Sequence, residues 1–219
     1  MKMKMMYYCR LTAFATALAL LALAPNGVRS EEAKEKAPLK QNPWVLKKDK
    51  DGIKVFIRNV EGIDFKEFLG VIVIDEPLEK VEALMNDVPN QVNWMCDMIE
   101  SRVIKSDPVN PIQYNVITAP MVSNRDVIIQ TRVVRSPGKI VRYFKGITLD
   151  SVPPRKGIVR MPKMTGLWTF ERIGAKQTRV TYQNLADPGG SLPSGLVNMT
   201  VLKQPFVTLK GMREQLKKR

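Results

Sequence analysis

The stretch LPSGLVNMTVLKQPFVTLKGMREQL, residues 192–216, decides how the rest of this chain can fold. Its apolar side chains recur at steps of three and four, namely at Leu192, Leu196, Met199, Leu202, Phe206, Leu209, Met212 and Leu216. This spacing predicts an amphipathic helix, which would be about 37 Å long at 1.5 Å per residue. We expect Pro205 to kink this helix and Gly211 to loosen it. A helix with one long apolar face needs a broad apolar surface to cover.

Strand patterns fill most of the chain before this helix. The runs WVLKKDK and IKVFIRNV flank Asp51-Gly52, a pair that predicts a tight hairpin turn. Further strand patterns, separated by turn residues, occupy residues 65–75, 101–105, 112–118, 126–135, 140–147, 157–161, 166–172 and 178–185. The short connections favour antiparallel neighbours, and a helical spacing interrupts the strands at residues 77–88.

The order of these elements predicts an α+β fold, because strands and helices are segregated along the chain. A curved antiparallel β-sheet would present one apolar face, and the long C-terminal α-helix would lie across that face. A sheet wrapped around a helix in this way leaves an internal cavity between them.

The first thirty residues differ from the rest of the chain. Lys2, Lys4 and Arg10 precede an uncharged, largely apolar run of 14 residues at 11–24. A membrane-spanning helix needs about 20 apolar residues, so this run fits the core of a signal peptide, with cleavage between Ser30 and Glu31. A short anchor that stays attached is the alternative. We therefore expect a signal peptide at 1–30, a flexible segment at 31–42, one domain at 43–219, and an exported, periplasmic protein.

The net charge is +14, from 35 basic and 21 acidic residues. Loss of residues 1–30 removes four basic residues and no acidic one, which leaves +10. Excess basic charge favours anionic surfaces, and export excludes nucleic acid as the natural partner. A basic cluster at the C-terminus either is a solvated surface or docks transiently on an anionic membrane; it comprises Lys210, Arg213, Lys217, Lys218 and Arg219.

The chain contains no histidine and two cysteines. Cys9 lies in the expected signal peptide, which leaves Cys96 without an intramolecular disulfide partner. The absence of histidine removes the commonest general base and metal ligand. We expect no metal and no cofactor, and we also predict a monomer that is not an enzyme.

Several motifs, taken in order, resemble the START (StAR-related lipid-transfer) domain family, especially its exported bacterial members. They are WVLKKDKDGIKVFIR at 44–58, SNRD at 123–126, Val159-Arg160, GLWTF at 166–170 and TYQNLADPGGSLPSGLVN at 181–198. The resemblance covers residues 44–211. It implies a helix-grip fold, in which a strongly bent antiparallel sheet grips the C-terminal helix, with a cavity for one lipid or sterol. It also implies binding or transfer without catalysis.

Arg125 is a candidate for contact with a lipid headgroup. Alternation along its strand places it on one face with Val127 and Ile129, which is the more apolar face and hence the interior. A buried arginine needs a partner. That partner is either a phosphate or hydroxyl of the ligand or a carboxylate of the protein.

The other candidates for the cavity wall are aromatic, apolar or named by the resemblance. They are Trp94, Tyr114, Arg160, Trp168, Tyr182, Leu196, Met199, Leu202 and Phe206. Aromatic residues on strand faces serve equally as ordinary core, and the helix stripe serves equally to pack on the sheet. A buried tyrosine hydroxyl needs a hydrogen bond, which a ligand can supply.

The leading hypothesis is a protein that binds and transfers a lipid or sterol-like ligand, with the C-terminal helix or residues 152–157 as the gate. Two alternatives remain open. A helix-grip cavity can also host cyclase or hydrolase chemistry on a hydrophobic substrate. The same groove can instead bind an apolar segment of a protein partner.

Overall fold

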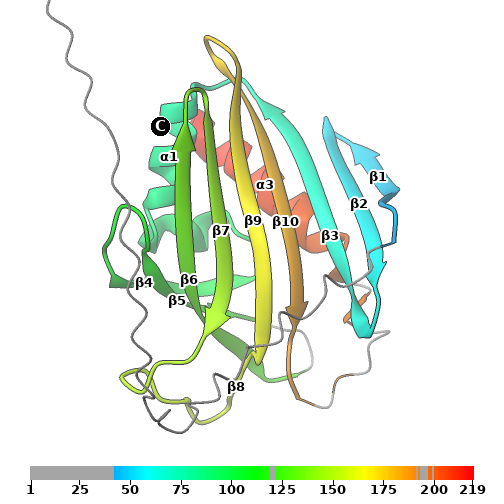
Figure 1. The fold of residues 1–219 in the computed structure, drawn as a ribbon, viewed down its shortest axis with the longest axis vertical. Coiled ribbons are helices and arrows are strands. Elements are labelled where there is room, and N and C mark those ends of the chain that lie inside the picture. Colours follow the sequence, from blue (N-terminus) through cyan, green and yellow to red (C-terminus); the bar gives the residue numbers. More distant parts are fainter. Residues whose placement is uncertain (1–41, 119–121, 191, 193–196, 199) are drawn as a thin grey trace, which may run out of the picture. The chain divides into compact units, whose positions relative to one another are not determined.

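The computed structural model describes residues 42–118, 122–190, 192, 197, 198 and 200–219. Within them the chain forms one ten-stranded sheet with helices on its concave face (Figure 1). The elements are β1 Val45–Lys50, β2 Ile53–Val60, β3 Ile63–Ile74, α1 Leu78–Asn86, the 3-10 helix η1 Pro89–Asn93, β4 Met98–Lys105, β5 Ile112–Ile117, β6 Asn124–Ser136, β7 Lys139–Ile147, β8 Ile158–Arg160, β9 Lys163–Gly174, β10 Gln177–Asp187 and α3 Lys203–Lys217.

The strand order is β1-β2-β3-β10-β9-β7-β6-β5-β4, and each of these neighbours is antiparallel. The predicted hairpin is present, since Asp51 and Gly52 have φ values of 55° and 73° between β1 and β2. Pairing of β3 with β10 joins the N-terminal hairpins to the rest of the sheet.

One expectation about strand direction is wrong. β8 pairs with β6 in parallel, whereas short connections predicted antiparallel neighbours throughout. In the connection between β7 and β8, Leu149 and Val152 pack on the cluster of Tyr114, Val116 and Ile128. Because β7 runs antiparallel to β6 and the chain then reverses, β8 runs in the same direction as β6.

The C-terminal helix runs diagonally across one face of the sheet, as the sequence predicted (Figure 1). α3 packs against β2, β3 and α1, while α1 packs against β9 and β10. The α+β helix-grip architecture is therefore confirmed.

The predicted kink at Pro205 is wrong. α3 begins at Lys203, so Pro205 lies in its first turn, where the backbone nitrogen has no helical partner to lose. Val201 and Leu202 form a turn before α3. The helix is consequently shorter than residues 192–216, and Leu196 and Met199 fall outside the described residues.

Gly211 allows close packing of α3 and does not loosen it. A β-carbon at Gly211 would lie 2.3 Å from the backbone oxygen of Trp94. On the sheet side, a β-carbon at Gly70 of β3 would lie 2.7 Å from Leu209 Cδ1 and 3.1 Å from Pro205 Cβ. Gly70 therefore lets side chains of α3 pack directly on the backbone of β3. Gly211 lets the backbone of α3 pack against the backbone at Trp94.

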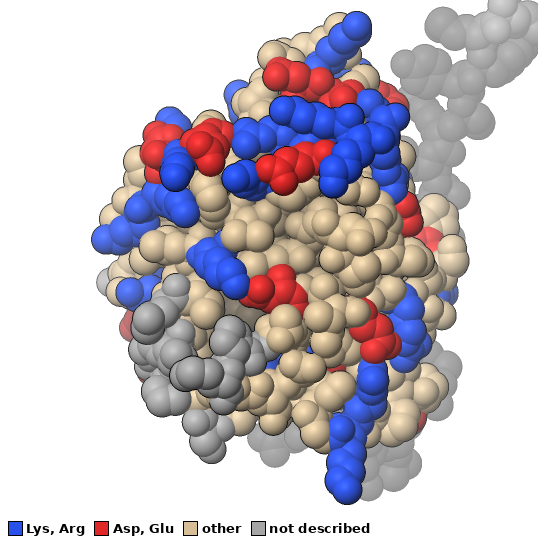
Figure 2. Space-filling view, turned by 180° about the vertical axis from the view of Figure 1, so that it is seen from behind, with Lys and Arg blue, Asp and Glu red and all other residues tan. Residues whose placement is uncertain are grey.

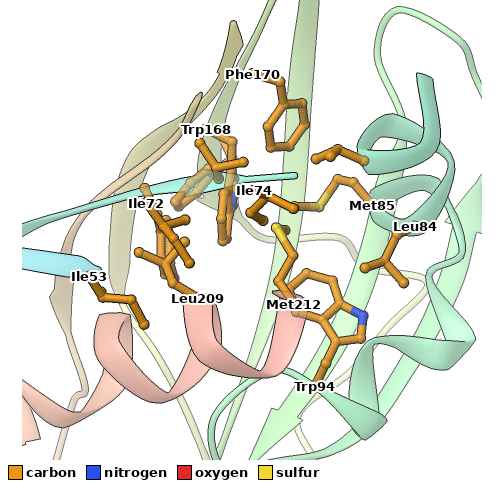
Figure 3. Packing of buried hydrophobic residues seen from close by; sticks show 14 of the residues in the cluster. Ile53, Ile72, Ile74, Leu84, Met85, Trp94, Trp168, Phe170, Leu209 and Met212 are labelled. Carbon is orange, nitrogen blue, oxygen red and sulfur yellow. The ribbon is translucent and has the colours of Figure 1, made fainter. Parts of the chain in front are cut away.

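The core lies between α3 and the sheet (Figure 3). Leu209 and Met212 on α3 are fully buried and face Ile72, Ile74 and Trp94 (Figure 3). These contacts account for the apolar spacing that the sequence shows along the helix.

Gly211→Ala should destabilise the protein. In an unhindered helix this change stabilises by about 1 kcal/mol, but here the added methyl group meets the Trp94 backbone, and overpacking costs about 1–3 kcal/mol. Urea denaturation should show a lower unfolding free energy. Val207→Ala, at a position on α3 that is 39% exposed, is the control. A Gly211→Ala protein as stable as wild type would contradict the close approach.

Candidate functional site

A cavity of about 60 Å³ lies between the concave face of the sheet and the α1–η1 segment. Strands β4, β5, β6, β7, β9 and β10 form its wall, and α1, η1 and Met95 after η1 cover it. The lining residues are Met85, Gln91, Met95, Met98, Gln113, Asn115, Ile117, Val127, Ile129, Thr131, Arg142, Phe144, Met164, Trp168 and Tyr182.

One side of the cavity is apolar and aromatic. The rings of Trp168 and Tyr182 stack with centroids 3.8 Å apart and an interplanar angle of 4°. Phe144 lies next to Tyr182, with centroids 6.3 Å apart. Burial raises the pKa of Tyr182, so its hydroxyl stays protonated and available as a donor.

The other side carries a network of amides. Gln113 Nε2 donates to Gln91 Oε1 at 2.9 Å and to Asn115 Oδ1 at 3.1 Å. Ser101 donates to Asn115 Oδ1 at 3.0 Å, and Gln91 Nε2 donates to the Met85 carbonyl at 3.0 Å. These bonds fix the polar wall and tie η1 to β4 and β5.

Arg142 is the single charged side chain among the described lining residues. It is 5% exposed, and its Nη1 donates to Asn86 Oδ1 at 2.6 Å. Burial lowers the pKa of Arg142 to about 10, so the guanidinium remains charged at neutral pH.

Of the residues that the sequence proposed, Trp168 and Tyr182 line this cavity. Trp94 is buried beside it, with its ring centroid 6.4 Å from that of Trp168. Leu202 and Phe206 pack on the core, so the expectation that they form the cavity wall is wrong. No described residue of α3 lines the cavity, because the segment after η1 lies between them.

Tyr114 and Arg160 are corrections to the expected cavity wall, because both lie on the opposite face of the sheet. Asp126, which is fully buried, accepts hydrogen bonds from Arg160 Nε at 2.7 Å, Arg160 Nη2 at 3.1 Å and the Tyr114 hydroxyl at 2.8 Å. Tyr114 packs there with Val116 and Ile128 in a second apolar cluster. Both faces of β5 are buried, so alternation alone could not identify its inner face.

Arg125 has the predicted orientation but not the predicted partner. It shares the inner face with Val127 and is 6% exposed. It donates to the carbonyl oxygens of Ser123 and, at 3.5 Å, Pro188, and no carboxylate of the described residues pairs with it. Arg125 thus ties the start of β6 to the chain after β10. Contact of Arg125 with a ligand stays a prediction.

Sequence reasoning missed the polar half of the cavity: Gln91, Gln113, Asn115, Thr131 and Arg142. Arg142 did leave a signal in the sequence, because it lies on the same face of β7 as Ile140 and Phe144. A charged residue within an alternating apolar face marks a position that needs an explanation. The amides left no comparable signal, since their hydrogen bonds join segments distant in sequence.

The comparisons with known proteins agree with this geometry. A family model for the START domain matches residues 29–219. The chain belongs to the START domain family. An uncharacterized protein of Pseudomonas aeruginosa is 36% identical over 178 residues, which are 80% of this chain and 88% of that protein.

Two further relatives place this START domain among known members. The crystal structure of the STAR-related lipid transfer protein from Xanthomonas axonopodis has a TM-score of 0.75 and 37% identity, over 80% of this chain and 99% of that one. The mouse START domain-containing protein 10 is 27% identical over 179 residues, and these span 60% of its length and 80% of this chain.

The described part of this START domain contains no helix long and apolar enough to cross a membrane. It also contains no group of three or more acidic or cysteine side chains placed to hold a metal ion.

Arg160→Met should strongly destabilise the protein, because it leaves the Asp126 carboxylate buried without its cation. Loss of one partner of a buried pair costs about 3–5 kcal/mol, which thermal and urea unfolding would detect. Adding Asp126→Asn should restore part of that loss. Arg179→Met is the control, since Arg179 pairs with Glu171 but is 47% exposed, and such pairs contribute at most about 1 kcal/mol. Equal effects of the two single changes would refute a structural role for the Arg160 pair.

Proposed function

We propose that this START domain binds one lipid or sterol-like molecule, with the apolar part of the ligand in the cavity, and transfers it between membranes. The observation that carries the proposal is a largely apolar cavity under the concave face of the sheet. Burial of apolar ligand surface there contributes about 25 cal/mol per Å². The relative from Xanthomonas axonopodis, which is described as a lipid transfer protein, supports the same role.

The cavity must enlarge to accept a lipid. Its 60 Å³ hold only about two water molecules at 30 Å³ each. Four methionines line it, Met85, Met95, Met98 and Met164. Methionine is unbranched and flexible, so these side chains can move aside with a small loss of packing. The described form is thus the collapsed state of a pocket that a ligand expands.

We propose that α3 gates the cavity through the segment after η1. Three contacts attach α3 to this segment: Gly211 against Trp94, Thr208 Oγ1 accepting from the Cys96 backbone N–H at 3.1 Å, and Lys203 pairing with Asp97 at 2.9 Å. Met95, which covers the cavity, lies between these anchors. Movement of α3 would therefore release the cover.

The C-terminal end of α3 is basic, and in the proposed mechanism this end contacts the membrane. Figure 2 shows Lys and Arg side chains gathered, with acidic ones among them, at the end of the molecule where the chain terminates. Arg219 pairs there with Asp87, next to the cavity cover. Each basic residue near an anionic bilayer contributes about 1 kcal/mol. We propose that this end docks transiently on the membrane that supplies or receives the ligand.

The proposed setting is the periplasm, after export through the signal sequence at residues 1–30 and its removal near Ser30. Those residues lie outside the described part of the chain. We further propose that the protein acts as a monomer and binds its ligand without transforming it.

Lipid should co-purify with the protein, and the binding of this lipid should depend on the cavity. Native mass spectrometry of protein purified from its own host should show one bound lipid mass. Val127→Phe, which adds bulk to a wall residue that is 1% exposed, should fill the cavity and reduce the bound fraction by about tenfold, at a stability loss of about 1–3 kcal/mol. Val73→Phe, at a site 42% exposed on β3, should leave binding unchanged. Absence of any lipid, or equal loading of both variants, would overturn the proposal, and release of a processed product would indicate catalysis.

Cys96 provides a native probe of the gate. Burial, with a hydrogen bond to Asp97, raises the pKa of the Cys96 thiol to about 12. Because the thiolate is the reactive form, alkylation at pH 8 should be at least about 100-fold slower than in denaturant. Anionic vesicles should accelerate it if α3 moves, and peptide mass mapping separates Cys96 from Cys9. Neutral vesicles are the control. A rate unaffected by anionic vesicles would rule out the gate.

A further inference from the structure

Arg142 is a buried cation whose charge no described side chain neutralises. None of the ion pairs among the described residues includes it, and Asn86 accepts its single hydrogen bond. Glu82, whose field favours the charged form of Arg142, is already bound to Arg135, with Oε1 at 2.7 Å from Nη2 and 3.0 Å from Nε. The other donors of the Arg142 guanidinium have no hydrogen-bond partner among the described residues.

The cavity itself supplies no negative charge. Its described lining contains amides, one threonine, one tyrosine and sulfur or hydrocarbon groups, but no aspartate or glutamate. A buried guanidinium without a counter-ion is unfavourable, since burial penalises the charged form. A cavity with an unpaired positive charge is stabilised most by a ligand that carries a negative charge.

Arg142 also lies where the cavity meets the outside. A groove of about 290 Å³ runs between the end of α1 and the β4–β5 connection, and Arg142 and Gln113 line both the groove and the cavity. Lys105 and Arg135 line the groove as well. Its one acid, Asp107, is held by Lys105 at 3.0 Å and by the backbone N–H groups of Val109 and Asn110. An anion could therefore reach Arg142 through a basic groove.

We propose that Arg142 binds the anionic headgroup of the lipid, a phosphate or a carboxylate, at the junction of groove and cavity, while the acyl chain occupies the cavity. The planar donor fork of arginine matches both anions. Gln113 lines the same junction, but its Nε2 already donates to Gln91 and Asn115, so Arg142 supplies the donors for the headgroup. This proposal rests on the proposed lipid-binding function and assigns it a ligand class, anionic lipids over neutral ones.

The test compares two ligands that differ only in the phosphate group. Oleoyl lysophosphatidic acid and monooleoylglycerol share the chain and the glycerol, and only the former carries a phosphate. Dissociation constants measured by calorimetry should show the anionic lipid bound at least about tenfold more tightly by the wild-type protein, as expected for a charge-assisted contact. Inorganic phosphate alone should bind far more weakly, because it gains nothing from the cavity.

Arg142→Met should abolish this preference, so that the two lipids bind with similar affinity. It should remain folded, since it removes an unpaired buried charge, and its thermal unfolding is measured in parallel. Arg142→Lys keeps the charge without the fork and should retain part of the preference. Arg132→Met is the matched control, because Arg132 lies exposed on the neighbouring strand, over the Tyr143 ring, and should bind both lipids as wild type does.

The outcomes separate this inference from the proposed function. Equal binding of both lipids by wild type, or a preference that survives in Arg142→Met, would overturn the headgroup site and leave lipid binding intact. Binding of neither lipid would overturn lipid binding itself. Inorganic phosphate binding as tightly as the anionic lipid would show a site for free anions and refute the lipid headgroup.

Discussion

The structure depends on the close approach of α3 to two backbones. Gly70 lets the helix settle on β3, and Gly211 lets it touch the chain at Trp94. These contacts allow Leu209, Met212 and Leu216 to become fully buried. If α3 stood farther out, the concave face would be exposed, and the cover of the cavity would lose its support. Under the proposed gate, the residues that hold the helix would also hold the cavity closed.

The two faces of the sheet handle buried charge in opposite ways. On the outer face, Asp126 is saturated by Arg160 and Tyr114, and a crossing loop seals the cluster. On the inner face, Arg142 has a single amide partner. A neutralised pair of this kind serves the fold, whereas an unmatched cation on a cavity wall is a feature that a ligand can use. The contrast favours the inner face as the functional one.

The cavity combines fixed and adaptable walls. Hydrogen bonds among Gln91, Gln113 and Asn115 keep the polar side in place, while methionines and stacked aromatics form the rest. A fixed polar end can select a headgroup, and a soft apolar end can accept chains of different shape. The flexible methionine side chains can also change the volume of the cavity at a small loss of packing.

The sequence by itself determined the fold class, since the helical spacing of residues 192–216 and the alternation of the strands are local and periodic. It also placed Trp168 and Tyr182 on the inner face, and the Asp51-Gly52 turn in its hairpin. It could not determine that Pro205 lies in the first turn of a helix, because first-turn and interior positions share the same apolar spacing. Nor could it separate Tyr114 from the cavity, because both faces of β5 are buried. Only the tertiary structure decided the polar half of the site, since Arg142, Gln91 and Asn115 meet through pairings between segments far apart in the chain. Periodicity indicates which side chains are buried, whereas the packing of distant segments decides which residues those side chains contact.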